Sequence, residues 1–127
     1  MILTIESSLP SFKTVKFHEG LNVLLSDKNQ TSTDKKTRNS AGKTSLVEII
    51  HFLLGADCDK ASLLREKELI QHTFKGRFRV GDELFTIERG GADPSKVFLL
   101  SGGEDRQDLP KKLDKDSGLF FVSNTNW

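Results

Sequence analysis

The sequence predicts a single α/β domain that contains a mixed sheet, one helix and an antiparallel β meander. Three observations support this prediction. Short apolar segments open the chain, one central stretch has the apolar period of a helix, and apolar and charged residues alternate along the segments that follow. The chain has 127 residues, the length of one domain, so we treat residues 1–127 as a single unit.

Composition and charge are those of a soluble globular protein. Hydrophobic residues make up 35% of the sequence, and no apolar run approaches the ~20 residues that span a bilayer. The first residues lack the features of a secretion signal. The one cysteine, Cys58, excludes an internal disulfide and fits a reducing compartment. We therefore expect a cytoplasmic protein without membrane contact. The net charge of +1 gives no global argument for nucleic acid.

Three strands are predicted in the first quarter of the chain, at residues 2–5, 12–17 and 21–25. The second alternates apolar residues with lysines, as a half-exposed strand does. The third, LNVLL, follows a turn at Gly20 and is typical of a buried strand. Residues 26–40 contain no apolar residue, which predicts a loop.

A helix is predicted after this loop, where the apolar period changes. Its apolar stripe consists of Leu46, Val47, Ile49, Ile50, Leu53 and Leu54. Gly55 stands where a glycine commonly ends a helix. The wide apolar face indicates that the helix packs against a sheet.

The second half of the chain returns to strand patterns after a loop and one short helix at residues 56–72. Residues 73–100 contain turn sequences at 81–82 and 90–95, which predict a three-stranded antiparallel meander. Within it, Phe74, Phe78 and Val80 share one face. Residues 118–122 predict a last short strand. The final SNTNW resembles a helix start without a helix after it, which suggests a fragment of a longer protein.

The helix start carries a candidate phosphate loop. The pattern G-x-x-x-x-G-K-[ST] is met by Gly42, Lys43 and Thr44, while Thr37 replaces its first glycine. Backbone N–H groups of residues 40–45 would point at phosphate oxygens at the positive end of the helix. Lys43 would lie along the β- and γ-phosphates, and the Thr44 hydroxyl would bind Mg²⁺.

The alternative is a Gly-Lys-Thr sequence that occurs by chance at an ordinary helix start. A lysine in the first helical turn is unfavourable by about 0.3–1 kcal/mol against the helix dipole unless an anion lies there. No acidic residue between Asp34 and Glu48 supplies that anion. The charge pattern therefore favours a phosphate ligand.

Two stretches, FHEGLNVLL and RNSAGKTSLVEIIHFLLG, resemble the opening of SMC-like ABC ATPases, the head domains of chromosome-maintenance and DNA-repair proteins. They are especially similar to bacterial coiled-coil members of ABC-three-component, defence-type systems. Residues 1–55 carry most of the resemblance, and residues 56–100 are similar more loosely. Asn39, Gly42, Lys43 and Thr44 match the family's nucleotide loop, although Ser40 replaces a usual glycine and about ten extra residues precede the motif.

The resemblance implies the N-terminal lobe of an ABC-type P-loop NTPase head that binds ATP and Mg²⁺. The implied ATP-binding set is Asn39, Ser40, Ala41, Gly42, Lys43, Thr44 and Ser45, with Thr44 as the metal ligand. In such families a coiled coil follows, a C-terminal lobe supplies the signature motif and Walker B, and two heads dimerise. The implied biological setting is DNA repair or defence.

Residues 99–107, LLSGGEDRQ, contain a sequence like the ABC signature motif. A working signature motif begins a helix, whereas this one ends a predicted strand, and Pro110 interrupts any helix soon after. We therefore predict a turn. No Asp-Glu pair follows the last strand, so the chain contains no Walker B and no catalytic residue. We expect an ATPase only in the complete protein.

The sequence also leaves a different class of function open. The chain could be a nucleic-acid- or protein-binding β module with a degenerate phosphate loop. Lys75, Arg77 and Arg79 share one strand face and could contact DNA phosphates. An ordinary solvent-exposed face of an antiparallel sheet is the simpler explanation for these three residues.

Overall fold

The structure is a computed structural model that describes residues 1–24, 43–103 and 106–127. The helical elements are α1 (Lys43–Leu53) and the short 3₁₀ helices η2 (Leu63–Arg65) and η3 (Asn124–Asn126). The strands are β1 (Ile2–Ser7), β2 (Val15–Lys16), β3 (Thr73–Val80), β4 (Glu83–Gly90), β5 (Lys96–Ser101), β6 (Lys112–Leu113) and β7 (Phe120–Ser123).

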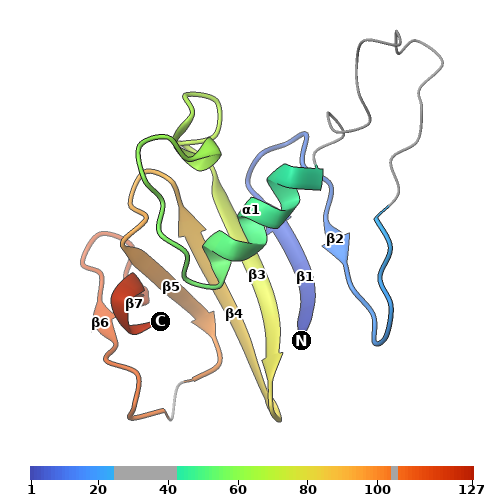
Figure 1. The fold of residues 1–127 in the computed structure, drawn as a ribbon. Coiled ribbons are helices and arrows are strands. Elements are labelled where there is room, and N and C mark those ends of the chain that lie inside the picture. The colour runs from blue at the N-terminus through green and yellow to red at the C-terminus, as the bar shows by residue number, and fades with distance from the viewer. Residues whose placement is uncertain (25–42, 104–105) are drawn as a thin grey trace, which may run out of the picture.

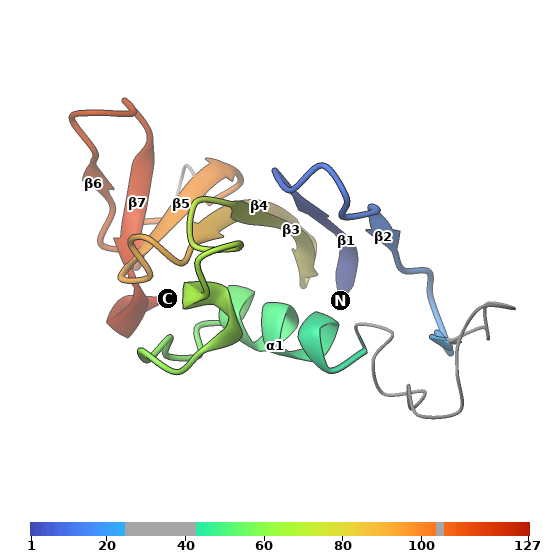
Figure 2. The same cartoon turned by 90° about the horizontal axis from the view of Figure 1, so that it is seen from above.

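These strands form one open seven-stranded sheet, with α1 lying across one face (Figure 1). The strand order is β2-β1-β3-β4-β5-β7-β6, and every neighbouring pair is antiparallel. Seen from above, α1 lies on one side of the sheet, and no described helix covers the other side (Figure 2). The α/β class is confirmed. The expected mixed sheet is wrong for the described residues, because no parallel pair forms among them.

The meander is confirmed as the centre of the sheet. β3 and β4 pair along their whole length, from Thr73↔Gly90 to Val80↔Glu83, around a two-residue turn. Gly81 lies in that turn with φ +59°, a conformation that favours glycine. The predicted apolar face is buried at Phe74 and Phe78 but exposed at Val80, because the hairpin tip lies beyond the end of α1 (Figure 1).

Helix α1 is also confirmed, with a narrower buried face than the sequence predicts. Ile49, Phe52 and Leu53 are buried, whereas Val47 and Leu54 are exposed. The C-terminal glycine is confirmed, since Gly55 has φ +102°. Its N–H donates to the Phe52 carbonyl at 3.1 Å, and the Ala56 N–H donates to the His51 carbonyl at 2.9 Å. This pair of bonds is a Schellman motif, which satisfies two carbonyls at the helix end.

The third predicted strand is wrong in the part that the structure describes. Residues 21–24 are not a strand, and the Leu21, Val23 and Leu24 side chains are 81%, 66% and 48% exposed. An apolar sequence forms a buried strand only where neighbouring strands and a covering layer exist. The preceding strand, β2, has only two residues, and both of them pair with β1.

Arg89 is a buried charge that links α1 to the sheet. Its side chain is 0% exposed, on the same face of β4 as Phe85 and Ile87. The guanidinium donates to the carbonyls of Phe52 and Pro94 and lies 4.0 Å from the centre of the Phe52 ring. Burial lowers the pKa of Arg89 to about 10, which leaves it charged at neutral pH. A cation at the C-terminal end of a helix also interacts favourably with the helix dipole.

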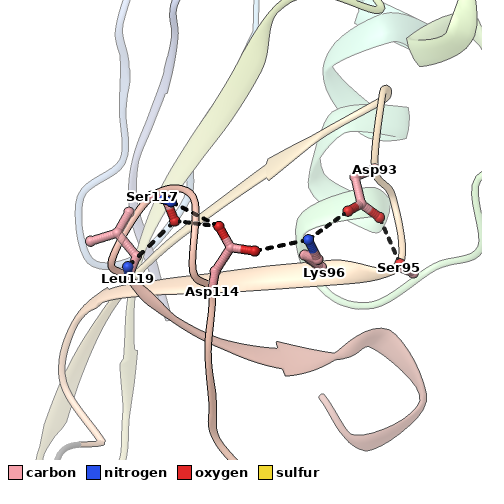
Figure 3. Close-up of polar contacts among 6 residues, drawn as sticks. All are labelled: Asp93, Ser95, Lys96, Asp114, Ser117 and Leu119. Atoms are coloured by element: carbon pink, nitrogen blue, oxygen red, sulfur yellow. Dashed lines mark hydrogen bonds and ion pairs between the residues drawn. The ribbon is translucent and has the colours of Figure 1, made fainter.

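A polar network fastens the loop before β7 to β5 (Figure 3). Lys96 Nζ lies 2.9 Å from Asp114 Oδ1 and 3.1 Å from Asp93 Oδ2. The other Asp114 oxygen, Oδ2, accepts bonds from the Ser117 hydroxyl at 2.7 Å and the Ser117 N–H at 3.0 Å. The Lys96 ammonium and the Ser117 donors lower the pKa of Asp114 to about 2.

This network predicts an acid-dependent loss of stability. A carboxyl whose pKa falls on folding stabilises the native state above its unfolded pKa, about 3.9 for aspartate. That contribution disappears as the pH falls from about 4 to about 2, through the folded pKa. Urea unfolding of the parent and of Asp114→Asn should therefore differ most near neutral pH and converge towards pH 2. Asp116→Asn, an exposed change in the same loop, is the control. A difference that does not depend on pH would contradict this assignment.

Candidate functional site

The N-terminal turn of α1 holds the described part of the candidate phosphate site. Lys43 begins the helix, Thr44 is exposed and Ser45 is half-buried. Asn39, Ser40, Ala41 and Gly42 lie outside the described residues. The first turn contains no acidic residue, and Lys43 forms no ion pair within the described ranges.

The chemistry of this helix start suits an anion. The first N–H groups of a helix have no partner within the helix and form the positive end of its dipole. Lys43 adds a full positive charge at the same end, and Thr44 adds a hydroxyl that can bind a cation or a phosphate oxygen. A phosphate with Mg²⁺ is the kind of ligand that would complement these groups, and its binding here stays a prediction.

A mainly apolar cavity of about 440 Å³, partly open to solvent, lies beside the N-terminal half of α1. Its walls come from α1, the β1–β2 connection, β2, Leu24, residues 63–69 and β3. Phe12 and Phe74 contribute an edge-to-face ring pair with centroids 6.0 Å apart. Sequence analysis did not identify this cavity, because it depends on how segments far apart in the chain pack together. The one feature of the sequence that pointed to this cavity was the alternation of Phe12 and Val15 with lysines.

The basic face of β3 is less positive than the sequence predicts. Lys75 is paired in register with Glu6 on β1 and Glu88 on β4. Arg79 forms an ion pair with Glu19 at 2.5 Å. Arg77 is exposed and is paired in register with Thr4 and Thr86. Of the three predicted DNA-contacting residues, it alone has neither an acidic partner in register nor an ion pair in the described chain. Contact with DNA remains a prediction.

The signature-like sequence ends a strand, as predicted. Leu100 and Ser101 are the last residues of β5, and the Ser101 hydroxyl donates to Thr86 Oγ1 at 2.9 Å. Gly102 then bends the chain with φ +85°, and a Cβ atom there would lie 2.0 Å from the Leu84 carbonyl oxygen. The backbone at Gly102 therefore packs so closely against β4 that a side chain has no room there. Glu104 lies outside the described residues.

The described ranges contain no group of three or more His, Cys, Asp or Glu side chains placed to hold a metal ion. Among the helices described, none is both long and apolar enough to cross a membrane. Thr44 therefore stays the one predicted metal ligand.

Comparisons with protein-family models, with curated proteins and with solved structures find no match to this chain.

Proposed function

We propose that the chain binds the phosphates of ATP, together with Mg²⁺, through a Walker A loop. In this proposal it forms half of an SMC-like ATPase head. A C-terminal lobe of the same protein completes the head, two heads dimerise, and the complete ATPase acts in DNA repair or defence. The observation that carries the proposal is the positive charge of Lys43 at the start of α1, which no acidic residue of the described ranges pairs with; Lys43 and Thr44 of the Gly-Lys-Thr sequence begin this helix, which packs on the sheet.

The geometry supports this proposal in two ways. Lys43, Thr44 and Ser45 lie in one helical turn, so their backbone N–H groups and side chains are close enough to serve one phosphate group. The helix that carries them is fixed at its other end by the Schellman motif and by Arg89. A site on a rigid element holds its ligand in one orientation more accurately than a site on a free loop.

The test is equilibrium binding of a fluorescent ATP analogue with and without Mg²⁺. Lys43→Ala should raise the dissociation constant at least about 10-fold, because a hydrogen bond to a charged group contributes about 1.5–3 kcal/mol. The fold should be unaffected, since Lys43 has no ion pair in the described structure. Lys60→Ala removes the same charge from an exposed position outside α1 and is the matched control.

The result also separates the two classes of function. Equal affinity of the parent and Lys43→Ala for the analogue would refute the phosphate site. Binding of a short DNA duplex that is lost in Arg77→Ala but kept in Lys43→Ala would favour the β-module alternative.

A further inference from the structure

Strand β6 forms one edge of the sheet, and no strand of the described ranges lies beyond it (Figure 1). Neighbouring positions of an antiparallel pair alternate between residues that exchange N–H···O bonds and residues that do not. The Asp114 N–H donates to the Leu119 carbonyl at 2.9 Å, so the adjacent pair Leu113↔Phe120 exchanges no such bond. The N–H and C=O groups of Leu113 therefore point away from β7, towards the open edge. Such groups are a template for another strand.

The apolar side chains beside this edge are also uncovered. Ile87, Leu99, Phe120 and Leu113 form one row across β4, β5, β7 and β6, on the face of the sheet that carries α1. Ile87 and Leu99 are 0% and 8% exposed, whereas Phe120 and Leu113 are 55% and 58% exposed. The row thus extends beyond the cover that α1 provides and is exposed where it reaches the edge.

The opposite face of β6 carries charges of both signs. Lys112 is exposed and forms no ion pair within the described ranges. Two positions further on, Asp114 belongs to the network with Lys96 and Asp93 (Figure 3). This network contains two carboxylates and one ammonium group, so it keeps an excess of negative charge beside the edge.

We propose that the chain forms a homodimer in which β6 pairs antiparallel with β6 of a second copy, about a two-fold axis at Leu113. Leu113 then exchanges N–H···O bonds with Leu113 of the second copy, and Lys112 lies opposite Asp114 of that copy. Opposite charges at directly opposed positions stabilise a sheet, and the symmetry forms this pair twice. On the other face, Phe120 and Leu113 of both copies continue one apolar row. The partner is a second copy because this edge complements itself in backbone groups, charge and apolar surface.

One pair of like charges accompanies this register, Lys111 opposite Lys115 of the second copy. Lys111 is turned towards its own chain, where its Nζ donates to the Gly103 carbonyl at 2.7 Å, and Lys115 lies in the turn after β6. Two short edges bury less than the roughly 1,200 Å² of a stable interface, so we expect a weak dimer, with a dissociation constant of about 10–100 μM. The pairing needs no nucleotide and does not depend on the proposed function.

The test is sedimentation equilibrium of the chain without nucleotide, at protein concentrations up to about 1 mM. Leu113→Pro removes the outward N–H and no bond to β7, so it should abolish the dimer and leave the sheet intact. Lys16→Pro is the matched control on the opposite edge. The Phe17 N–H donates to the Leu3 carbonyl, so the Lys16 N–H also points outwards, and this variant should dimerise like the parent. A monomeric parent, or a dimer that persists in Leu113→Pro, would overturn the proposal.

A charge reversal tests the register of the pairing. Lys112→Glu places a carboxylate opposite Asp114 of the second copy and should raise the dissociation constant at least about fivefold, because the symmetry changes two pairs at once. Lys60→Glu makes the same change at an exposed position away from β6 and should have a much smaller effect. Circular dichroism and Trp127 fluorescence verify that each variant is folded. Equal effects of the two reversals would show that β6 is not the contact.

Discussion

Replacing Arg89 with alanine is expected to lower the free energy of unfolding by about 3–5 kcal/mol. The change removes a side chain that is 0% exposed and so leaves a cavity against Phe52. It also leaves the carbonyls of Phe52 and Pro94 without the guanidinium as donor. A domain of this size has a total stability of about 5–15 kcal/mol, so the variant should be largely destabilised. Urea unfolding followed by Trp127 fluorescence measures the effect.

Two further substitutions show which property of Arg89 matters. Arg89→Lys keeps a positive charge and a long stem but cannot donate in two directions from a planar fork, so it should recover only part of the loss. Arg77→Ala, on the exposed face of β3, should change stability by no more than about 0.5 kcal/mol. If Arg89→Ala unfolds at the same urea concentration as the parent, Arg89 does not link α1 to the sheet.

Under the proposed function, the second large effect concerns catalysis. The chain alone should show no ATPase activity above that of Lys43→Ala. Its sequence supplies no Walker B carboxylates and no helix-starting signature motif. In phosphate-loop enzymes, one catalytic group supplied by a partner changes the rate by about 10³–10⁵. Adding a C-terminal lobe with both motifs should therefore restore turnover by a factor in that range.

Phosphate release at several protein concentrations tests this expectation. Turnover in the completed head should rise more steeply than linearly with protein concentration, because two heads must meet. The completed head carrying Lys43→Ala is the control. Hydrolysis by the isolated chain that requires Lys43 and is first order in protein would show that this chain contains a complete active site.

The elements that could be predicted are those fixed by residues close together in sequence. The β3–β4 hairpin follows from the turn at Gly81, and its partners are immediate neighbours in the chain. The end of α1 follows from Gly55, whose positive φ satisfies a local requirement. The bend after Ser101 follows from Gly102 in the same way.

The features that sequence analysis missed depend on distant parts of the chain. Arg89 is buried because the carbonyls of Phe52 and Pro94 accept its protons, and Phe52 is 37 positions away. Its alternation with Phe85 and Ile87 was a signal that could have placed it on the inner face. Residues 21–24 show the opposite error, since apolar composition predicted burial where the structure provides no strand partner.

The pairing of β1 with β3 has a consequence for how the chain is made. β1 lies between β2 and β3, and its longest ladder is with β3, where Ser7 bonds to Thr73 across a separation of 66 residues. A ribosome adds about 5–20 residues per second, so β1 waits roughly 3–13 s for this partner during synthesis. Ile5, fully buried in the finished sheet, is without its β3 partner Gly76 for that time. The β3–β4 hairpin closes in about 1–10 μs once it emerges. Until β3 has been synthesised, β1 therefore has an unpaired edge, which is the feature of a strand that favours misassembly.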